Sequence, residues 1–319
     1  MTRRVLIVTH GGRETAVAAA REAARELEAV GFAVSLHDDD LAEGFGPEGE
    51  EIEVVRDKER VEESEVVLVM GGDGTLLRAA ELTHGTDVPL LGVNLGHVGF
   101  LAESDRDDLR TTVQRLAACD YTVEERGTID VTVHLPEGGE PVRGWALNEA
   151  TVEKASRERM IEVAVEVDGR PMSSFGCDGV VMSTATGSTA HAFSAGGPVV
   201  WPDVDAMLLV PISAHALFAR PVVVGPRSVL AVEVATTSSS PGVLMCDGRR
   251  QIDLPVGSRV EVRRCPDPIR LARLSAAPFT DRLVSKFSLP VVGWRGGTAR
   301  SALTGGSTSS TTDEEGSRA

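Results

Sequence analysis

The sequence predicts an α/β domain with a parallel sheet, followed by a mostly-β domain. Three observations carry this prediction. The chain opens with the pattern strand, helix, strand; an apolar run at 66–70 ends in two glycines ahead of a helix; and short alternating segments follow one another after Cys119. At 319 residues the chain is long enough for two domains, each with a core of its own.

The opening segment has the β-α-β pattern that is typical of parallel strands joined by a right-handed crossover. A strand is predicted over 4–10 and a helix over 14–30, where apolar residues repeat at helical spacing and Gly31 can end the helix. The second strand is predicted over 32–36. The acidic, glycine-containing stretch 38–63 is predicted to be a mobile loop over one edge of the sheet.

The apolar run 66–70 is predicted to be a fully buried strand that ends at Gly71 and Gly72. Only glycine lets a backbone turn tightly and also bring its N–H groups close to a ligand. A helix is predicted from Leu76 to Leu82, so the glycines lie at a strand-to-helix turn, which suits a phosphate group. Asp73 in this turn would repel an anion unless it holds a metal ion or takes a proton; the alternative is a plain turn with local hydrogen bonds.

The rest of the first domain continues the α/β pattern, which places a ligand site at the C-terminal ends of the strands. A strand over 88–93 leads into the stretch 94–101, which is predicted to be a loop crossing the mouth of the sheet, and a helix follows over 108–118. His10-Gly11-Gly12, after the first strand, could form a second phosphate-facing turn, although a Gly-Gly pair after a strand is a weak signal.

The second domain is predicted to consist mainly of strands. They cover 121–126, 128–135, 142–152, 160–167, 179–183, 208–212, 222–224, 229–235, 243–246 and 259–264. The predicted boundaries are 1–118 for the α/β domain, 119–275 for the β-rich domain, 276–296 for a helical segment that packs back on the first domain, and 297–319 for a tail. The tail contains Gly, Ser and Thr without an apolar period and is predicted to be disordered.

Composition excludes several classes of protein. The formal net charge is −16 and the lysines are Lys58, Lys154 and Lys286, so a broad electrostatic footprint for nucleic acid is not expected. No apolar run is long enough to span a membrane, and the N-terminus lacks the apolar core of a signal peptide. The four cysteines have no paired spacing, which predicts neither a zinc site nor a disulfide framework. A cytoplasmic protein is expected.

Three polar stretches interrupt the predicted β domain. Asn148-Glu149 breaks an apolar strand, and an amide beside a carboxylate can bind ribose hydroxyls or a base edge; a solvent-facing strand position is the alternative. Asp178-Gly179 is followed by the hydroxyl-rich segment 184–198, which can line a nucleotide cleft. Cys246-Asp247-Gly248-Arg249-Arg250, taken alone, is typical of a hairpin tip.

Together these stretches resemble the NAD kinase family. They are Gly71-Gly72-Asp73-Gly74-Thr75, Asn148-Glu149, Asp178-Gly179, the segment 184–198 and Cys246-Asp247-Gly248, in the family's order and spacing over residues 3–294. The Gly-Gly-Asp-Gly turn alone is shared with diacylglycerol kinases and phosphofructokinases. The resemblance implies a Rossmann- or phosphofructokinase-like first domain. It also implies transfer of a phosphoryl group from ATP, or from inorganic polyphosphate, to the 2′-hydroxyl of the adenosine ribose of NAD, giving NADP.

The resemblance also implies roles for individual residues. Asp73 would be the general base, Asn148 and Glu149 would hold the acceptor, and Asp178 would bind the ribose on the nicotinamide side. Phosphate would be bound by Gly71, Gly72, Gly74 and Thr75, and the remaining NAD-binding positions would be Arg78, Arg159, Gly176, Thr189, Ala190, His191, Ala192, Phe193 and Ser194. Members of the family use Mg²⁺ or Mn²⁺, whose ligands here are unassigned. They are homodimers or homotetramers whose clefts borrow residues from a neighbouring subunit.

The chain departs from the family pattern at three positions. Ala185 replaces a usual Pro, His191 a usual Tyr, and Phe218 a small polar residue, which leaves the base contacts at His191 open. Two other functions are alternatives to an NAD kinase. A lipid kinase would need an apolar membrane-facing patch, which is not evident, and a non-catalytic nucleotide sensor would gain nothing from Asp73 beside phosphates.

Overall fold

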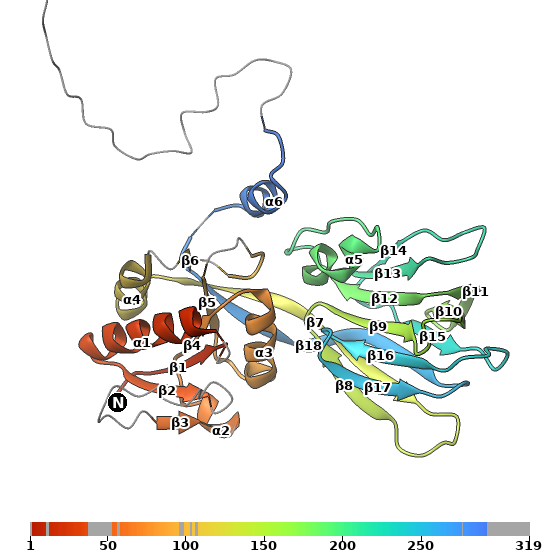
Figure 1. Cartoon of the computed structure of the whole chain (residues 1–319), viewed down its shortest axis with the longest axis horizontal. Coiled ribbons are helices and arrows are strands. Elements are labelled where there is room, and N and C mark those ends of the chain that lie inside the picture. The colour runs from red at the N-terminus through yellow and green to blue at the C-terminus, as the bar shows by residue number, and fades with distance from the viewer. Residues whose placement is uncertain are drawn as a thin grey trace, which may run out of the picture.

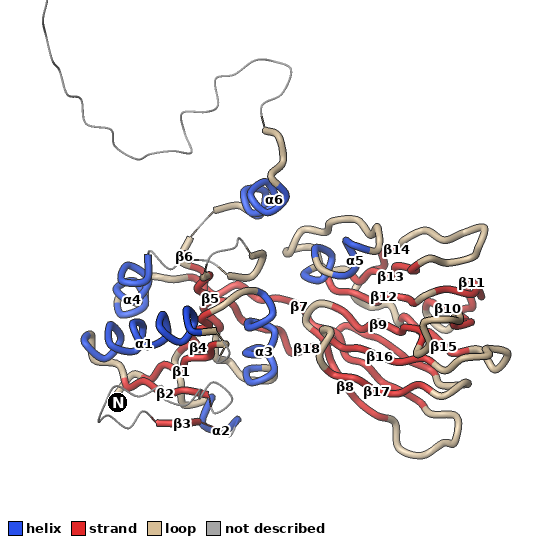
Figure 2. Tube along the Cα trace, in the orientation of Figure 1, coloured by secondary structure: helices blue, strands red, loops and turns tan. Residues whose placement is uncertain are grey.

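The computed structural model describes residues 2–10, 13–37, 53–55, 58–95, 99–102, 104–105, 108–275 and 277–291. Helices gather around a sheet in the N-terminal domain, whereas the C-terminal domain is built almost entirely of strands (Figures 1 and 2). The predicted fold class is therefore confirmed. No helix of the described part is long and apolar enough to cross a membrane.

The N-terminal domain is organised around a parallel sheet. Parallel pairs join β1 (Arg4–Thr9) to β2 (Ala33–His37) and β4 (Val66–Met70), β2 to β3 (Glu53–Val55), β4 to β5 (Leu90–Asn94), and β5 to the short β6 (Ser104–Asp105). Every residue of β4 is buried, because both faces of the sheet are covered.

Helices cover both faces of this sheet. Helices α1 (Glu14–Ala29) and α4 (Leu109–Ala117) pack on one face, where their alanines and leucines meet alternate residues of β1 and β4. Helices α2 (Lys58–Val61) and α3 (Asp73–Thr83) pack on the other face. This alternation follows from the period of two along a strand, which sends neighbouring apolar side chains to opposite faces.

Two long antiparallel strands join the domains. β7 (Thr122–His134) pairs with β18 (Arg259–Arg273) from Thr122–Arg273 to His134–Arg259, and β18 also pairs in parallel with β5 through Leu271 and Leu90. Figure 1 shows both strands crossing from one domain into the other. The final segment contains α6 (Phe279–Phe287), near the junction of the two domains.

The C-terminal domain packs two sheets face to face. One continues the first sheet through β18 to β15, β10 and β11, with β7 and β8 alongside; the other has the order β14-β13-β12-β9-β16-β17. Buried valines, isoleucines and leucines from both sheets form one core between them. The strands are β8 (Val142–Ala146), β9 (Glu149–Lys154), β10 (Ile161–Val167), β11 (Arg170–Cys177), β12 (Gly179–Thr184), β13 (Met207–Ile212), β14 (Val222–Val224), β15 (Leu230–Val234), β16 (Gly242–Cys246) and β17 (Arg250–Leu254).

Several element predictions are corrected by the structure. The single strand predicted over 142–152 is two strands in different sheets, β8 and β9, because the chain turns at Leu147 and Asn148. The separate strands predicted over 121–126 and 128–135 are one strand, β7, which continues through Gly127 opposite a register shift in β18. The strand predicted over 259–264 extends to Arg273, and β11 and β17 were not predicted.

Some predictions lie outside the described residues. These are the turn at Gly11 and Gly12, most of the loop predicted over 38–63, the middle of the loop predicted over 94–101, and the tail 297–319. Within the predicted loop 38–63, the described parts contain β3 and α2. The helix predicted from Leu76 begins earlier, at Asp73, because the carbonyl of Gly72 already accepts the N–H groups of Thr75 and Leu76.

We expect Gly92→Ala to destabilise the N-terminal domain. A Cβ at Gly92 in β5 would lie 2.8 Å from the backbone Cα of Ala102 and 3.1 Å from Leu76 Cδ1, so the loop or the helix must shift. Overpacking of this kind costs about 1–3 kcal/mol in the free energy of unfolding, measured by urea titration. Gly127→Ala in β7 is the matched control, because a Cβ there meets nothing within 4 Å. Equal stability of both variants would contradict the packing argument.

Candidate functional site

The central feature of the site is the turn between β4 and α3. Gly71 is buried, its N–H donates to the carbonyl of Val93 at 3.0 Å, and a Cβ there would collide with the side chain of Thr75. Gly72 and Gly74 are exposed and have open space around them. The turn therefore keeps one glycine for close packing and presents the backbone of the other two to solvent, at a helix N-terminus that favours an anion.

Asp73 occupies the first turn of α3 and is half-buried. Its carboxylate accepts the backbone N–H of Phe100 at 3.2 Å and that of Leu101 at 3.1 Å. A Cβ on Gly99 would lie 2.5 Å from Asp73 Oδ1, so only glycine lets this loop close over the carboxylate. The Asp73 carboxylate is thus oriented by a segment that comes from the end of the neighbouring strand, β5.

A cavity of about 340 Å³ opens at the C-terminal ends of β1, β4 and β5. Gly71, Gly72 and Thr75 line it, as the sequence predicted for a phosphate site, together with His10, Arg13, Thr15, Ala16, Asn94 and Leu95. The predicted Arg78 lies nearby but its guanidinium donates to the carbonyl of Thr9, so it anchors the end of β1. The cavity combines backbone amides, hydroxyls and positive charge, which are the groups that bind phosphate.

Asn148 and Glu149 are both buried at the turn from β8 into β9. Leu147, which precedes them, packs in the same core as Leu76 and Ala79 of α3, so this turn lies against the helix that begins with Asp73. The backbone carbonyl of Asn148 accepts the N–H of Thr184 at 2.9 Å and the hydroxyl of Ser183 at 3.1 Å. The predicted pair is therefore a fixed feature of the interior and not a solvent-facing strand position.

Glu149 is an unusual carboxyl group. Burial and, to a smaller extent, the nearby charge of Asp247 raise the pKa of Glu149 to about 8, although a hydrogen bond from the backbone of His191 opposes the shift. Its Oε2 atom is buried and has no hydrogen-bond partner in the described structure. A carboxyl that keeps its proton at neutral pH can donate a hydrogen bond as well as accept one, which suits a hydroxyl ligand.

The hydroxyl-rich segment packs against this turn. It forms a 3₁₀ helix, Thr186–Thr189, and the single helical turn α5, His191–Ser194. A Cβ on Gly187 would collide with the carbonyl oxygen of Asn148, which is why the segment can approach so closely. The Thr184 hydroxyl donates to the carbonyl of Leu147 at 2.6 Å and accepts the N–H of Gly187 at 3.1 Å.

The predicted residues of this segment have different surroundings. Thr189 donates its hydroxyl to the carbonyl of Thr186 at 3.3 Å, Ala190 and His191 are half-buried, and Ala192 is buried against β12 and β13. Phe193 and Ser194 are exposed. The structure therefore leaves His191, Phe193 and Ser194 available to a ligand and uses Ala192 for packing.

Aromatic side chains bridge the two domains beside this segment. Phe287 of α6 lies 4.6 Å from Phe193 and 5.8 Å from Phe100, measured between ring centroids. Phe279 of α6 contacts Phe100 and Trp201 in the same way. Helix α6 therefore packs on Phe100, in the segment of the first domain that contacts Asp73, and on Phe193 in α5 of the second domain.

Three predicted residues lie elsewhere. Asp178 is at the other end of β12, where Lys154 bonds its carboxylate at 2.6 Å and holds the pKa of that group below its usual range. Strand pairing places Ser183 opposite Glu149 but Gly179 opposite Glu153, so about 16 Å of strand separate Asp178 from the position opposite Glu149. Gly176 is beside Asp178 and bonds His215, and Arg159 is exposed in the preceding loop. The structure does not bring these three together with Asp73.

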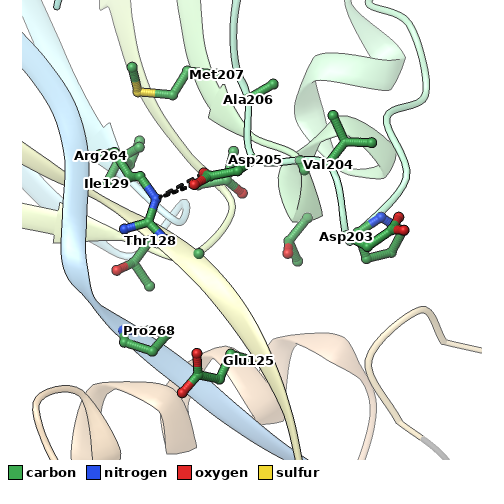
Figure 3. A pocket seen from close by; sticks show the side chains of 15 residues that line it. Glu125, Thr128, Ile129, Asp203, Val204, Asp205, Ala206, Met207, Arg264 and Pro268 are labelled. Atoms are coloured by element: carbon green, nitrogen blue, oxygen red, sulfur yellow. Dashed lines mark hydrogen bonds and ion pairs between the residues drawn. The ribbon is translucent and has the colours of Figure 1, made fainter. Parts of the chain in front are cut away.

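A second cavity of about 210 Å³ lies between the β7–β18 pair and the segment that precedes β13. Figure 3 shows the Arg264–Asp205 ion pair across it, with Glu125, Thr128 and Met207 around it. Its lining includes Ala185, one of the departures from the family pattern, but none of the predicted site residues. Thr184, Ala185 and Thr186 of the hydroxyl-rich segment also line it, so this cavity adjoins the site described above.

The arrangement defines a nucleotide-dependent phosphotransferase. A glycine turn whose geometry suits phosphate carries a carboxylate, and the helix that follows packs against Leu147, next to a buried amide–carboxyl pair that can hold an acceptor hydroxyl. Two family models match the chain: the ATP-NAD kinase N-terminal domain over residues 5–121 and the ATP-NAD kinase C-terminal domain over residues 147–274. The chain belongs to the NAD kinase family.

Relatives with high identity share almost the whole chain. An NAD kinase of Leifsonia xyli is 60% identical over 92% of this chain and 97% of its own length, and one of Thermobifida fusca is 55% identical over 92% of each chain. Among solved structures, an NAD kinase from Archaeoglobus fulgidus in complex with ATP has a TM-score of 0.67 at 25% identity, covering 91% of this chain and all of that chain. Yeast NADH kinase in complex with NADH shares the fold, with a TM-score of 0.82 at 20% identity over 92% of this chain and 89% of that chain.

Sequence reasoning missed the groups that hold the site together. The hairpin tip predicted for residues 246–250 is confirmed, but the sequence did not predict that Asp247 is buried there and bonds the Asn148–Glu149 turn. The contact between the rings of Phe100 and Phe287, beside the segment that bonds Asp73, was not predicted. The Cys246-Asp247-Gly248 motif was a signal for the first of these, whereas the aromatic contacts join residues too far apart in the chain to predict.

We expect the stability of the protein to fall as the pH rises from about 5 to 8, in part through Glu149. Its folded-state pKa, about 8, lies above the ordinary value of 4.5, so between these values the folded state binds more protons than the unfolded state and loses stability as pH increases. Urea unfolding at several pH values should show a shallower decline in Glu149→Gln, in which the shifted group is absent. Asp247, whose pKa is also raised, leaves a residual slope.

The control is Glu137→Gln, an exposed position in a turn, which should retain the wild-type decline. A Glu149→Gln variant with the wild-type slope would show that Glu149 does not hold its proton in the folded state.

Proposed function

We propose that this chain transfers the terminal phosphoryl group of ATP to the 2′-hydroxyl of the adenosine ribose of NAD, giving NADP and ADP. The observation that carries the proposal is the place of Asp73: it lies in the first turn of α3, directly after Gly71 and Gly72, which line the cavity. The same helix packs in one core with Leu147, which precedes Asn148 and Glu149. The relatives named NAD kinase support the choice of acceptor.

Asp73 acts as the general base in this reaction. A ribose hydroxyl is a very weak acid, so a carboxylate within hydrogen-bond reach assists its attack on phosphorus. The bond between the 2′-oxygen and phosphorus forms, the bond from phosphorus to the bridging oxygen of ADP breaks, and the hydroxyl proton passes to Asp73. The amides of Phe100 and Leu101 hold the Asp73 carboxylate in one orientation throughout.

The phosphate groups are bound by neutral backbone and by local positive charge. Gly72 lines the cavity at the N-terminus of α3, a place that favours an anion, and His10 and Arg13 also line the cavity. Catalysis of phosphoryl transfer depends mainly on such positioning and on neutralising the charge of the phosphate oxygens. Because these groups recognise phosphates and not a base, inorganic polyphosphate is proposed as a second donor.

A divalent cation, Mg²⁺ or Mn²⁺, is proposed as the cofactor. Within the described part of the chain no three His, Cys, Asp or Glu side chains come together, which fits a metal held by one carboxylate and by the substrate phosphates. Asp73 is the carboxylate that follows Gly71 and Gly72 of the cavity lining in the chain, and it would hold the ion together with the donor. The ion would neutralise charge on the transferred group.

The assembly is proposed to be a homodimer or homotetramer with shared clefts. Asp178 lies about 16 Å of strand away from the acceptor pair of its own chain, and Gly176 is beside it in the chain. We propose that these two residues and Arg159, which is exposed in the loop before β10, serve the cleft of a neighbour. Exposed apolar residues surround this edge of the β domain, which is expected of an interface; they include Met160, Met172, Leu217 and Phe218.

Because all four cysteines are free thiols, a reducing, cytoplasmic location is also proposed.

The experiment that tests the function is NADP formation from NAD, ATP and magnesium, repeated with polyphosphate in place of ATP. Absence of NADP with either donor would reject the proposal, and product with ATP alone would reject only polyphosphate as a donor.

We expect Asp73→Asn to lower turnover by about 10² to 10⁴, because general-base catalysis contributes a factor of that order. NAD binding, measured by calorimetry, should change little, since the amide keeps the shape of the side chain. If Asp73 served only as a metal ligand, raising the Mg²⁺ or Mn²⁺ concentration would restore much of the rate. Turnover near that of the wild type at every metal concentration would contradict both roles.

Shared clefts predict that two inactive variants restore activity when combined. Asp73→Asn and Asp178→Ala, co-expressed and purified as mixed oligomers, should recover about a quarter of the wild-type rate, because half of the dimers are mixed and each has one intact cleft. Combining Asp73→Asn with Glu149→Gln, assayed at low NAD, is the control and should give no recovery, since both side chains belong to the cleft of one chain. Mixed oligomers of the first pair without recovered activity would show that Asp178 does not act across subunits.

A further inference from the structure

Asp247 is buried although it occupies the tip of the β16–β17 hairpin. Its exposed fraction is 7%, and its φ of +53°, followed by Gly248 at +65°, is the left-handed conformation of a tight hairpin turn. Hairpin tips normally point into solvent, where an Asp is favoured by local hydrogen bonding. The burial of this carboxylate therefore requires an explanation beyond the turn itself.

The carboxylate of Asp247 accepts hydrogen bonds from three consecutive backbone N–H groups in the turn between β8 and β9. Oδ2 accepts the N–H of Leu147 at 3.0 Å, and Oδ1 accepts those of Asn148 at 2.7 Å and Glu149 at 3.4 Å. In return, the backbone N–H of Asp247 donates to the carbonyl of Glu149 at 2.9 Å. Successive amides that converge on one anion hold the chain in a single conformation, so Asp247 fixes the turn that presents Asn148 and Glu149.

The charge of Asp247 is balanced by Arg250, which connects it to the first domain. Arg250 Nη2 lies 2.7 Å from Asp247 Oδ2, and Arg250 Nε lies 3.3 Å from Glu81 Oε1 on α3. Arg249 also pairs with Glu81, at 3.1 Å. Glu81 belongs to the helix whose first turn carries Asp73, the proposed base. One chain of ion pairs therefore joins this helix to the Leu147–Glu149 turn, which we call the acceptor turn.

Aromatic contacts reinforce this connection. The guanidinium of Arg250 stacks 4.4 Å from the ring centroid of Trp145, which lies at the end of β8. Trp145 in turn stacks on His84, the residue that follows α3, at 3.8 Å between ring centroids and an interplanar angle of 8°. Because planar groups stacked in this way resist sliding, the position of α3 relative to the acceptor turn is held at two points, Glu81 and His84.

We propose that Asp247 is a positioning residue for the phosphoryl acceptor: it shapes the Leu147–Glu149 turn and, through Arg250 and Glu81, aligns that turn with the helix of Asp73. The inference deepens the proposed function and rests on it. Asp247 touches neither substrate in this account; it acts through the backbone of the two residues that do.

The test is Asp247→Asn. An amide has one acceptor oxygen, so its NH₂ group must face either the Leu147 amide and Arg250 or the amides of Asn148 and Glu149, and some donors lose their partner. We expect the KM for NAD, and the Kd for NAD by calorimetry, to rise about tenfold or more, while the KM for ATP stays within about twofold. A residue with a purely structural role would not separate the two substrates.

The matched control is Asp168→Asn. Asp168 has the same φ of +53°, precedes a glycine at a hairpin turn, and accepts the backbone N–H of Val229 at 2.8 Å, but it is remote from the acceptor turn. Its variant should keep both KM values. Equal effects of the two variants, or a loss of melting temperature in Asp247→Asn without a change in NAD affinity, would overturn the proposal.

A double-mutant cycle tests the route of the effect. If Asp247 acts through the acceptor turn, adding Asp247→Asn to Glu149→Gln should raise the KM for NAD less than it does in the wild type, whereas independent effects would multiply and contradict the proposal. Should Asp247→Asn fail to fold, Glu81→Gln on the exposed side of the same network must still raise the KM for NAD selectively, and an unchanged value would reject the alignment role. Failure of the proposed function is distinguishable, because the wild type would then make no NADP.

Discussion

The antiparallel pairing of β7 and β18 is the constraint on which the rest of the structure depends. One end of this ladder, from His134–Arg259, lies in the β domain, and the other end, at Thr122–Arg273, lies beside the parallel sheet, where Leu271 pairs with Leu90. Because the two strands are continuous across the junction, their backbone hydrogen bonds fix the orientation of both domains. A flexible linker would leave the phosphate-binding turn and the acceptor turn free to separate.

Buried charge supports this junction. Arg126 and Arg273 are nearly inaccessible, and both pair with Glu124, at 2.8 and 2.6 Å. Burial lowers the pKa of Arg126 to about 10, so the guanidinium still carries its charge at neutral pH and depends on Glu124 for compensation. Such groups contribute specificity of packing more than net stability, since their desolvation offsets most of the attraction between them.

Arginine side chains also hold the segment that contacts the Asp73 carboxylate, and one of them does so through a peptide group that bonds Asp73. Arg273 donates to the carbonyl of Leu101 at 3.2 Å and Arg282 of α6 donates to the carbonyl of Phe100 at 3.3 Å. The N–H of Leu101 belongs to the peptide whose carbonyl Arg282 holds, and that N–H bonds Asp73. Positive charge thus polarises a peptide toward the proposed base without placing a cation in contact with it, which orients the carboxylate and leaves its outer face for substrate.

The sequence predicted the parallel half of the fold well because the signals there are local. Apolar runs such as 66–70 and the glycines that follow them can be interpreted from neighbours in the chain. The strand predicted over 142–152 was wrong, because the break at Asn148 depends on Asp247, about a hundred positions away. β11 and β17 were missed because their exposed, polar faces obscure the alternation, and the separation of Asp178 from Glu149 follows from the β9–β12 register, which no local pattern contains.

The site also explains how a protein with a net charge of −16 can bind polyanionic substrates. Long-range repulsion between the surface and a nucleotide is screened within about 8–10 Å at physiological ionic strength. Inside that range the groups proposed to bind phosphate are the backbone at Gly72 and Gly74, the N-terminus of α3 and the side chains of His10 and Arg13. The charge of the two carboxyl groups at the Leu147–Glu149 turn is reduced or balanced as well: burial raises the pKa of Glu149 to about 8, and Asp247 is compensated by Arg250 and three amides. Asp73 is therefore left as the carboxylate of this cleft that is both accessible and poised at a phosphate-binding turn, which is what a base for phosphoryl transfer requires.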